Sequence, residues 1–212
     1  MKKHRGQVVK ERRGQVVKIG AWVLTISFLV FIGGCADDGM DWHSKNISGL
    51  MPELSFELTD ETGELVTAER YRGKIVMMFF GFTNCPHYCP ATLSKLSQVL
   101  NQLPDGIRED VRVLFVSVDP TRDSVEDIAT YTDNFASEVI GFTGTENQLR
   151  ELAKRYRTTF SYGKPNDKGN YDVSHGLAIY VFDRSGKARL MILEDQPIET
   201  ITADVKILAS PE

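Results

Sequence analysis

The chain has 212 residues, of which 42% are hydrophobic, 9% aromatic and 25% charged, which is typical of one globular domain with a full core. This composition excludes disordered, collagen-like and multi-pass membrane proteins. The first 34 residues contain seven Lys or Arg and one Glu, so the remaining 178 contain 18 basic and 28 acidic residues, a net charge of −10. We expect no nucleic-acid partner, because an acidic domain binds phosphate backbones poorly.

The N-terminus has the pattern of an export signal. A basic stretch, residues 1–18, precedes an uncharged and largely apolar run over residues 19–32, and two glycines then lead to Cys35. The apolar run has 14 residues, whereas a membrane-spanning helix needs about 20. Residues 32–35 resemble the lipobox of bacterial lipoproteins, which predicts a signal over residues 1–34 and a lipid on Cys35. An uncleaved anchor and ordinary cleavage are the alternatives.

A polar segment separates this signal from the rest of the chain. Residues 35–52 are rich in Asp, Ser, Asn and Gly and lack a sustained apolar period. We predict that they form a flexible tether and that residues 53–212 form the folded domain. A lipid or an N-terminal anchor would then hold this domain on a bacterial membrane, facing the periplasm or the cell exterior.

The folded part alternates predicted strands and helices. Alternating apolar residues over 54–58, followed by a turn at 60–63, predict an extra N-terminal β-hairpin. Continuous apolar runs over 74–81 and 111–118 are typical of strands that are buried on both faces. Three further short strands are predicted at 139–142, 177–182 and 188–193, the last two as a hairpin.

Helix signals lie between these strands. Apolar residues at helical spacing predict a helix over 91–103, with Pro90 at its first position. Ser124 with Asp127 and Thr145 with Gln148 are capping-box pairs that begin two more helices, and Pro197 begins a C-terminal helix. A βαβ unit followed by a ββα unit is the thioredoxin arrangement. We therefore predict an α/β, thioredoxin-like fold: a central mixed β-sheet with helices on both faces.

Cys85 and Cys89 lie in a proline-flanked loop between the most apolar strand and the following helix. Thiols at a helix N-terminus are favoured as thiolates. A thiolate is both the nucleophile of disulfide exchange and a soft ligand for Cu(I), so this redox-active pair leaves both functions open. Three residues separate the cysteines, where thioredoxin-type exchange uses two. A purely structural pair, either a disulfide or two small buried hydrophobic residues, is the third alternative.

Four histidines complete the set of candidate ligands. His4 lies in the signal, His43 in the predicted tether, His87 between the cysteines, and His175 before the C-terminal hairpin. In a thioredoxin-like fold the start of that hairpin faces the cysteine loop, so we expect His175 beside the cysteines. Two thiolates and one imidazole suit copper in either oxidation state, and zinc would accept them with one open position.

Four segments together closely resemble the Sco/SenC family of copper chaperones, over residues 54–208. They are Phe-Phe-Gly-Phe-Thr-Asn-Cys-Pro-His-Tyr-Cys-Pro, Val-Leu-Phe-Val-Ser-Val-Asp-Pro-Thr-Arg-Asp, Gly-Phe-Thr-Gly-Thr and Asp-Val-Ser-His. The resemblance implies a thioredoxin-like fold and a copper site of Cys85, Cys89 and His175 that holds Cu(I) or Cu(II). It also implies a role in delivering copper to, or reducing the cysteines of, the copper site of cytochrome c oxidase subunit II.

The chain departs from the family pattern at two places. His87 and Tyr88 stand where the family commonly has Asp-Val, and Ser174 stands where Asp is frequent. His87 is a candidate extra ligand, with a solvent-exposed substitution as the alternative. Asp172 is expected either to orient His175 through a hydrogen bond or to cap its loop.

Asp119 and Arg122 match another family motif near the site. We expect them to end the strand before them and to order the following loop, and the alternative is contact with a partner.

Two functions remain open from the sequence. The first is a membrane-tethered copper-binding assembly factor without enzymatic turnover. The second is an extracytoplasmic thiol-disulfide oxidoreductase or redox sensor that uses Cys85 and Cys89. A peroxide-reducing enzyme is disfavoured, because Thr83 and Asn84 do not reproduce a Thr-x-x-Cys context. Exported thiols drift towards disulfide, so the copper function implies a thiol reductant as well as a copper donor chaperone.

Overall fold

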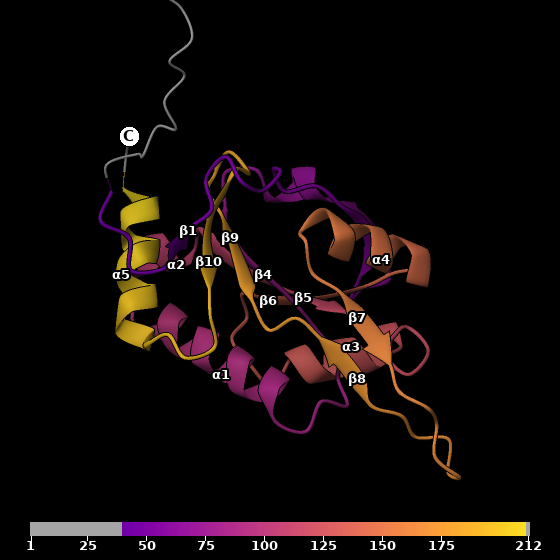
Figure 1. Cartoon of the computed structure of the whole chain (residues 1–212). Helices are drawn as coiled ribbons and strands as arrows, with labels where there is room; N and C mark the ends of the chain where they lie inside the picture. Colours follow the sequence, from indigo (N-terminus) through magenta and orange to yellow (C-terminus); the bar gives the residue numbers. More distant parts are fainter. Residues whose placement is uncertain (1–39, 211–212) are drawn as a thin grey trace, which may run out of the picture. The chain divides into compact units, whose positions relative to one another are not determined.

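An eight-stranded mixed sheet forms the centre of the part of the chain that the structure, a computed structural model, describes, which is residues 40–210 (Figure 1). Its strands, in spatial order, are β1 (Lys45–Asn46), β10 (Ala188–Ile192), β9 (Ile179–Phe182), β4 (Ile75–Gly81), β5 (Val111–Ser117), β6 (Val139–Thr143), β2 (Glu57–Asp60) and β3 (Leu65–Thr67). Strands β4, β5 and β6 are parallel, and the other pairs in the sheet are antiparallel. The mixed sheet and its N-terminal hairpin, β2 with β3, confirm the predicted fold class.

Helices cover both faces of this sheet (Figure 1). The helical elements are η1 (Ala68–Tyr71), α1 (Tyr88–Asn101), α2 (Asp105–Arg108), α3 (Val125–Thr132), α4 (Glu146–Arg155) and α5 (Ile198–Ala209). Buried side chains of α1, α3 and α5 pack on one face, and those of α4 and η1 pack on the other. Strand β4 supplies both cores, because its side chains alternate between the faces and all seven of its residues are buried.

The two predicted capping boxes are present in the structure. Ser124 and Asp127 begin α3, and Thr145 and Gln148 begin α4, with both reciprocal hydrogen bonds formed in each pair. Helix α1 differs from the prediction, because it begins at Tyr88 and not near residue 91. A proline in the first turn does not prevent this earlier start, since the N–H groups of that turn have no intrahelical partner.

A short antiparallel pair, β7 (Phe160–Tyr162) with β8 (Val173–His175), was not predicted. The polar segment 163–172 between the two strands gives no strand signal, and the pair protrudes from the edge of the domain near α3 and α4 (Figure 1). Because β8 ends at His175, this hairpin and not the start of β9 carries the histidine.

Part of the predicted tether is folded in the structure. Lys45 pairs with Met191 of β10, and Ile47 is 2% exposed. Ser44 is buried as well, and its backbone N–H donates to Asp204 of α5 at 2.8 Å. The domain therefore begins before residue 53. The carboxylate of Asp204 binds a segment around Ser44 whose sequence has no apolar period.

The predicted signal, residues 1–34, and the lipidation site Cys35 lie outside the described residues. Within residues 40–210, no helix combines the length and the hydropathy that crossing a bilayer requires.

Candidate metal centre

Strand β4 delivers the cysteine loop to the carboxyl edge of the parallel strands, where α/β proteins gather their functional groups. The strand ends at Gly81, which is packed closely by its neighbours. A Cβ atom at Gly81 would lie 2.8 Å from Sγ of Cys89 and 2.6 Å from a ring atom of Phe115. A residue without a side chain is therefore needed here to leave room for the Cys89 thiol.

The loop after β4 is anchored by the buried carboxylate of Asp123. Thr83 donates to it through its backbone N–H at 2.8 Å and through its hydroxyl at 2.6 Å. Ser117, at the end of β5, donates its hydroxyl to the same carboxylate at 2.5 Å. Asp123 itself is 1% exposed. Its two charge-assisted hydrogen bonds from Thr83 and the third from Ser117 tie the loop just before Cys85 to the end of β5. Asp123 was not predicted as a site residue, although it ends the Val-Leu-Phe-Val-Ser-Val-Asp-Pro-Thr-Arg-Asp segment.

Helix α1 brings the two thiols together. Cys89 lies in its first turn, and its backbone N–H donates to Sγ of Cys85 at 3.4 Å. Cys89 is 0% exposed and Cys85 is 8% exposed, and both are free thiols in the structure. A ligand must therefore reach the pair from the side of Cys85.

His175 completes the group with its Nε2 atom 3.7 Å from Sγ of Cys89. Its other ring nitrogen, Nδ1, lies 3.0 Å from the carbonyl oxygen of Gly176. A carbonyl can only accept, so Nδ1 carries the proton and donates it to this oxygen, which leaves the lone pair of Nε2 directed at the cysteines. The ring is also fixed by edge contact with Phe82, with centroids 5.7 Å apart at 84°.

The donor atoms of Cys85, Cys89 and His175 all lie within 4.8 Å of one another. Two sulfur donors and one imidazole nitrogen match the preferences of copper and zinc and are too soft for magnesium or calcium. The three side chains predicted as ligands thus form a group that can hold a soft metal ion.

Burial changes the pKa values of two of these groups. It raises the pKa of the Cys89 thiol far above its ordinary value, and the neighbouring Cys85 raises it further. It lowers the pKa of His175, which therefore stays neutral at pH 7. For Cys89 the predicted preference for thiolate at a helix N-terminus is wrong, because burial disfavours the charged form of the thiol. A metal ion must displace the Cys89 proton when it binds.

The hairpin that carries His175 is fastened to the end of β5. Asp119 accepts from Nε of Arg122 at 2.5 Å and from the hydroxyl of Tyr171 at 2.7 Å. Arg122 also donates to the carbonyl oxygen of Tyr171 at 2.9 Å and lies 3.8 Å from the centre of its ring. Asp119 and Arg122 thus order the approach to His175. Sequence reasoning missed Tyr171, which no local pattern distinguishes from other loop tyrosines.

The two remaining candidates lie at the edge of the group. His87 and Asp172 line the same cavity of about 450 Å³ as Cys85 and His175. His87 is exposed, and its ring lies outside the three-donor group. Asp172 makes no hydrogen bond to His175, whose Nδ1 is bonded to Gly176 instead.

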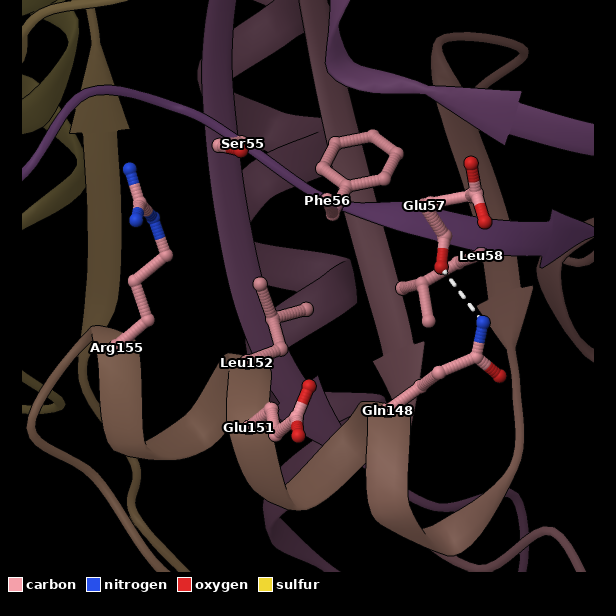
Figure 2. Close-up of a pocket in the computed structure, with 8 residues that line it drawn as sticks. All are labelled: Ser55, Phe56, Glu57, Leu58, Gln148, Glu151, Leu152 and Arg155. Carbon is pink, nitrogen blue, oxygen red and sulfur yellow. Dashed lines mark hydrogen bonds between the residues drawn. The ribbon is translucent and has the colours of Figure 1, made fainter.

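A second cavity, of about 400 Å³, lies between the segment before β2 and helix α4 (Figure 2). Leu58 and Leu152 are among the residues that line it, and Gln148 bridges the two elements by donating to the carbonyl oxygen of Glu57 at 3.1 Å. Its charged groups are two carboxylates and Arg155, and it has no cysteine or histidine. This cavity therefore lacks the donors that a soft metal needs.

Comparison with known proteins gives one consistent result. A family model described as SCO1/SenC matches residues 50–210. The human mitochondrial SCO1 homolog is 37% identical over 134 residues, which are 62% of this chain and 44% of that protein. A SCO2-like protein of Rickettsia prowazekii is 32% identical over 133 residues, 62% of this chain and 64% of that protein. The chain thus spans about half the length of the curated relatives it matches.

Solved structures of similar proteins agree with the fold. Bradyrhizobium japonicum ScoI with copper bound is 31% identical and has a TM-score of 0.67, covering 74% of this chain and 98% of that one. Yeast Sco1 with copper bound is 30% identical and has a TM-score of 0.68, covering 74% of this chain and 87% of that one.

Proposed function

The chain belongs to the SCO1/SenC family, whose model covers residues 50–210, and from this membership we propose that it is a copper-binding assembly factor for cytochrome c oxidase. Copper, in this proposal, is a cargo held by Cys85, Cys89 and His175. The observation that carries it is the convergence of these three donors within 4.8 Å. Two similar proteins have structures with copper bound, which supports the choice of copper over zinc.

Each donor has a chemical reason to serve copper. The two thiolates accept Cu(I), and the imidazole adds a ligand that Cu(II) favours. The protein prepares the imidazole, because the carbonyl oxygen of Gly176 keeps the proton on Nδ1 and the Nε2 lone pair stays free. Release of the Cys89 proton accompanies loading, since burial raises the pKa of that thiol.

The target in this proposal is subunit II of cytochrome c oxidase, to which the chain delivers copper or whose cysteines it reduces. A signal over residues 1–34 exports the domain, and a lipid on Cys35 or an uncleaved anchor tethers it outside a bacterial membrane. A copper donor chaperone supplies the ion. A thiol reductant keeps Cys85 and Cys89 reduced, because a disulfide between them would remove both sulfur ligands.

Thiol-disulfide exchange is a second candidate function. It is favoured by the position of the sulfur atoms of Cys85 and Cys89, which lie within 4.8 Å of each other beside an exposed loop. In this reaction the two thiols become one disulfide, and their two electrons and two protons convert a target disulfide into two thiols. His175 would then only tune a thiol.

An anaerobic titration of the reduced chain with Cu(II) separates the two candidates. We expect an intense thiolate-to-copper charge-transfer band that saturates at one equivalent and collapses in His175→Ala. His43→Gln is the matched control, because it removes a histidine that bonds to Asp204 and not to the metal centre. Retention of the band in His175→Ala would overturn the copper site. Catalysed disulfide exchange by that variant would support the second function.

A further inference from the structure

His87 differs from the other histidines of the described part of the chain. Nδ1 of His43 lies 3.1 Å from the carboxylate of Asp204, and Nδ1 of His175 lies 3.0 Å from the carbonyl oxygen of Gly176. The ring of His87 makes no hydrogen bond within residues 40–210, and the residue is exposed. Its imidazole therefore has both nitrogens available at the mouth of the metal-centre cavity.

The side chain of His87 does not stabilise helix α1. His87 is the N-cap residue, where the side chain of Ser, Thr, Asn or Asp would accept a first-turn N–H and stabilise the helix. His87 makes no such side-chain bond, and its backbone is at φ −137° and ψ −58°. Because the His87 side chain does not cap the helix, it is free to act as a metal ligand.

We infer that His87 is a fourth, exchangeable ligand that binds Cu(II) at the mouth of the Cys85, Cys89 and His175 site. This inference rests on the proposed copper function and concerns the valence and release of the ion. Cu(II) favours tetragonal sites with nitrogen ligands, whereas Cu(I) is satisfied by soft thiolates in lower coordination. Three donors would leave a fourth position on a Cu(II) ion open, and an imidazole from His87 would fill it.

His87 is close enough along the chain to Cys85 and Cys89 for this binding. Consecutive Cα atoms are about 3.8 Å apart, so the Cα of His87 lies at most about 7.6 Å from those of Cys85 and Cys89. In the structure the ring stands outside the three-donor group, so engagement requires rotation of the side chain. That rotation costs little, because an exposed ring without a hydrogen bond changes rotamer freely.

A thiol reductant that gives one electron to Cu(II) would yield Cu(I), with two such thiols forming one disulfide and releasing two protons for every two ions reduced. This reduction would release His87, because Cu(I) has no demand for a fourth, nitrogen ligand. The site would then open on the side of Cys85, the less buried thiol. His87 thereby couples the oxidation state of copper to the accessibility of the ion for a thiol-bearing partner.

The test counts the imidazoles bound to Cu(II) in the full reduced chain, loaded anaerobically with one equivalent and frozen at once. Electron spin echo envelope modulation is expected to show two imidazoles in the unaltered chain and one in His87→Ala. The charge-transfer band should remain in this variant, and transfer of Cu(II) to a chelator should become about tenfold faster, as the loss of about 1.4 kcal/mol of binding implies. The reduction potential should rise, since the lost ligand favours the oxidised ion.

Three variants serve as controls. Tyr88→Ala changes the exposed neighbour in the same cavity, while His43→Gln and His4→Ala remove the other histidines, and all three should keep two imidazoles. A single imidazole in the unaltered chain, or two in His87→Ala, overturns the inference while leaving the copper function intact. Failure of the unaltered chain to bind copper overturns both.

Discussion

The metal centre and the contact between residues 43–44 and α5 both join segments that are far apart in the chain, but they differ in how their polar atoms are bonded. At the second contact, Asp204 is 1% exposed and accepts from the backbone N–H groups of His43 and Ser44 at 2.9 and 2.8 Å. The Ser44 hydroxyl donates to it as well, at 2.5 Å. At the metal centre, Nε2 of His175 has within residues 40–210 no stronger hydrogen-bond contact than the one to the Cys89 sulfur at 3.7 Å, and the Cys85 sulfur also lies within 4.8 Å of it.

The difference separates a structural contact from a binding site. A buried carboxylate with several matched donors stabilises the fold and has little capacity left for a ligand. At the metal centre, the sulfur and nitrogen atoms have only long, weak contacts, 3.4 Å from the Cys89 N–H to Sγ of Cys85 and 3.7 Å from Sγ of Cys89 to Nε2 of His175, so their lone pairs can turn to a metal ion. The weak bonding of these atoms, together with their soft donor chemistry, therefore distinguishes the candidate metal centre from the contact at Asp204. Changes at the two clusters should accordingly have opposite consequences.

The largest effect is expected from Cys89→Ser. The variant loses a thiolate ligand, so copper affinity should fall by more than about 100-fold, since even residues that only support ligands contribute 10–100-fold. A competition titration with a copper chelator measures this loss, and circular dichroism monitors the fold. Unchanged affinity would mean that Cys89 is not a ligand and that the comparison between the clusters fails.

Asp204→Ala should destabilise the fold without weakening copper binding. Removing the carboxylate leaves the N–H groups of His43 and Ser44 without their buried acceptor, so the free energy of unfolding should fall by about 3 kcal/mol. Denaturant unfolding measures it. Copper affinity should stay unchanged, and Asp204→Asn, which keeps one acceptor oxygen, should lose less. A fall in copper affinity equal to that of Cys89→Ser would show that the two clusters are coupled.

The sequence predicts the metal centre better than it predicts this structural contact. Cys85 and Cys89 carry recognisable chemistry at a strand-to-helix junction, and the topology of a thioredoxin-like fold places His175 beside them. Asp204 has no such signal, because a polar residue on a helix is usually solvated and its partners at residues 43–44 lie in a segment without periodicity. Its role emerges only once the segment before β1 is packed on α5.

Two features of the metal centre itself also escaped sequence reasoning. The pKa of Cys89 depends on how deeply the first turn of α1 is buried, which no spacing reveals. The partner of Nδ1 in His175 is the carbonyl oxygen of Gly176 and not the side chain of Asp172. Main-chain carbonyls occur at every residue, so a sequence points to side-chain partners and overlooks them.

Gly81→Ala should affect the fold and the metal centre together. The added methyl group would stand 2.8 Å from Sγ of Cys89 and 2.6 Å from the Phe115 ring, so something in the core must move. Overpacking of this kind costs about 1–3 kcal/mol, and displacement of the thiol should also weaken copper binding. Thermal unfolding and the copper titration measure the two effects. Gly106→Ala, where an added Cβ meets nothing within 4 Å, is the control.

The smallest effect is expected where polar atoms are bonded but exposed. Asp110 accepts from Lys74 at 2.9 Å and from Arg184 at 3.1 Å, with its side chain 34% exposed. These hydrogen bonds hold the pKa of Asp110 below its ordinary value. Water screens such pairs, so Asp110→Asn should lower the free energy of unfolding by at most about 1 kcal/mol at pH 7.

The pH dependence of this small effect has a fixed sign. Because the pKa of Asp110 is lower in the folded state, its contribution is complete above the unfolded value of about 3.9 and is lost as pH falls through the folded value. The difference in unfolding free energy between the unaltered chain and Asp110→Asn should therefore vanish towards about pH 2. A difference that grows on acidification would contradict the ion-pair origin. At neutral pH, Asp204→Ala should lower the free energy of unfolding clearly more than Asp110→Asn does, because it removes a buried acceptor. Bonding and burial together therefore set the size of the effect.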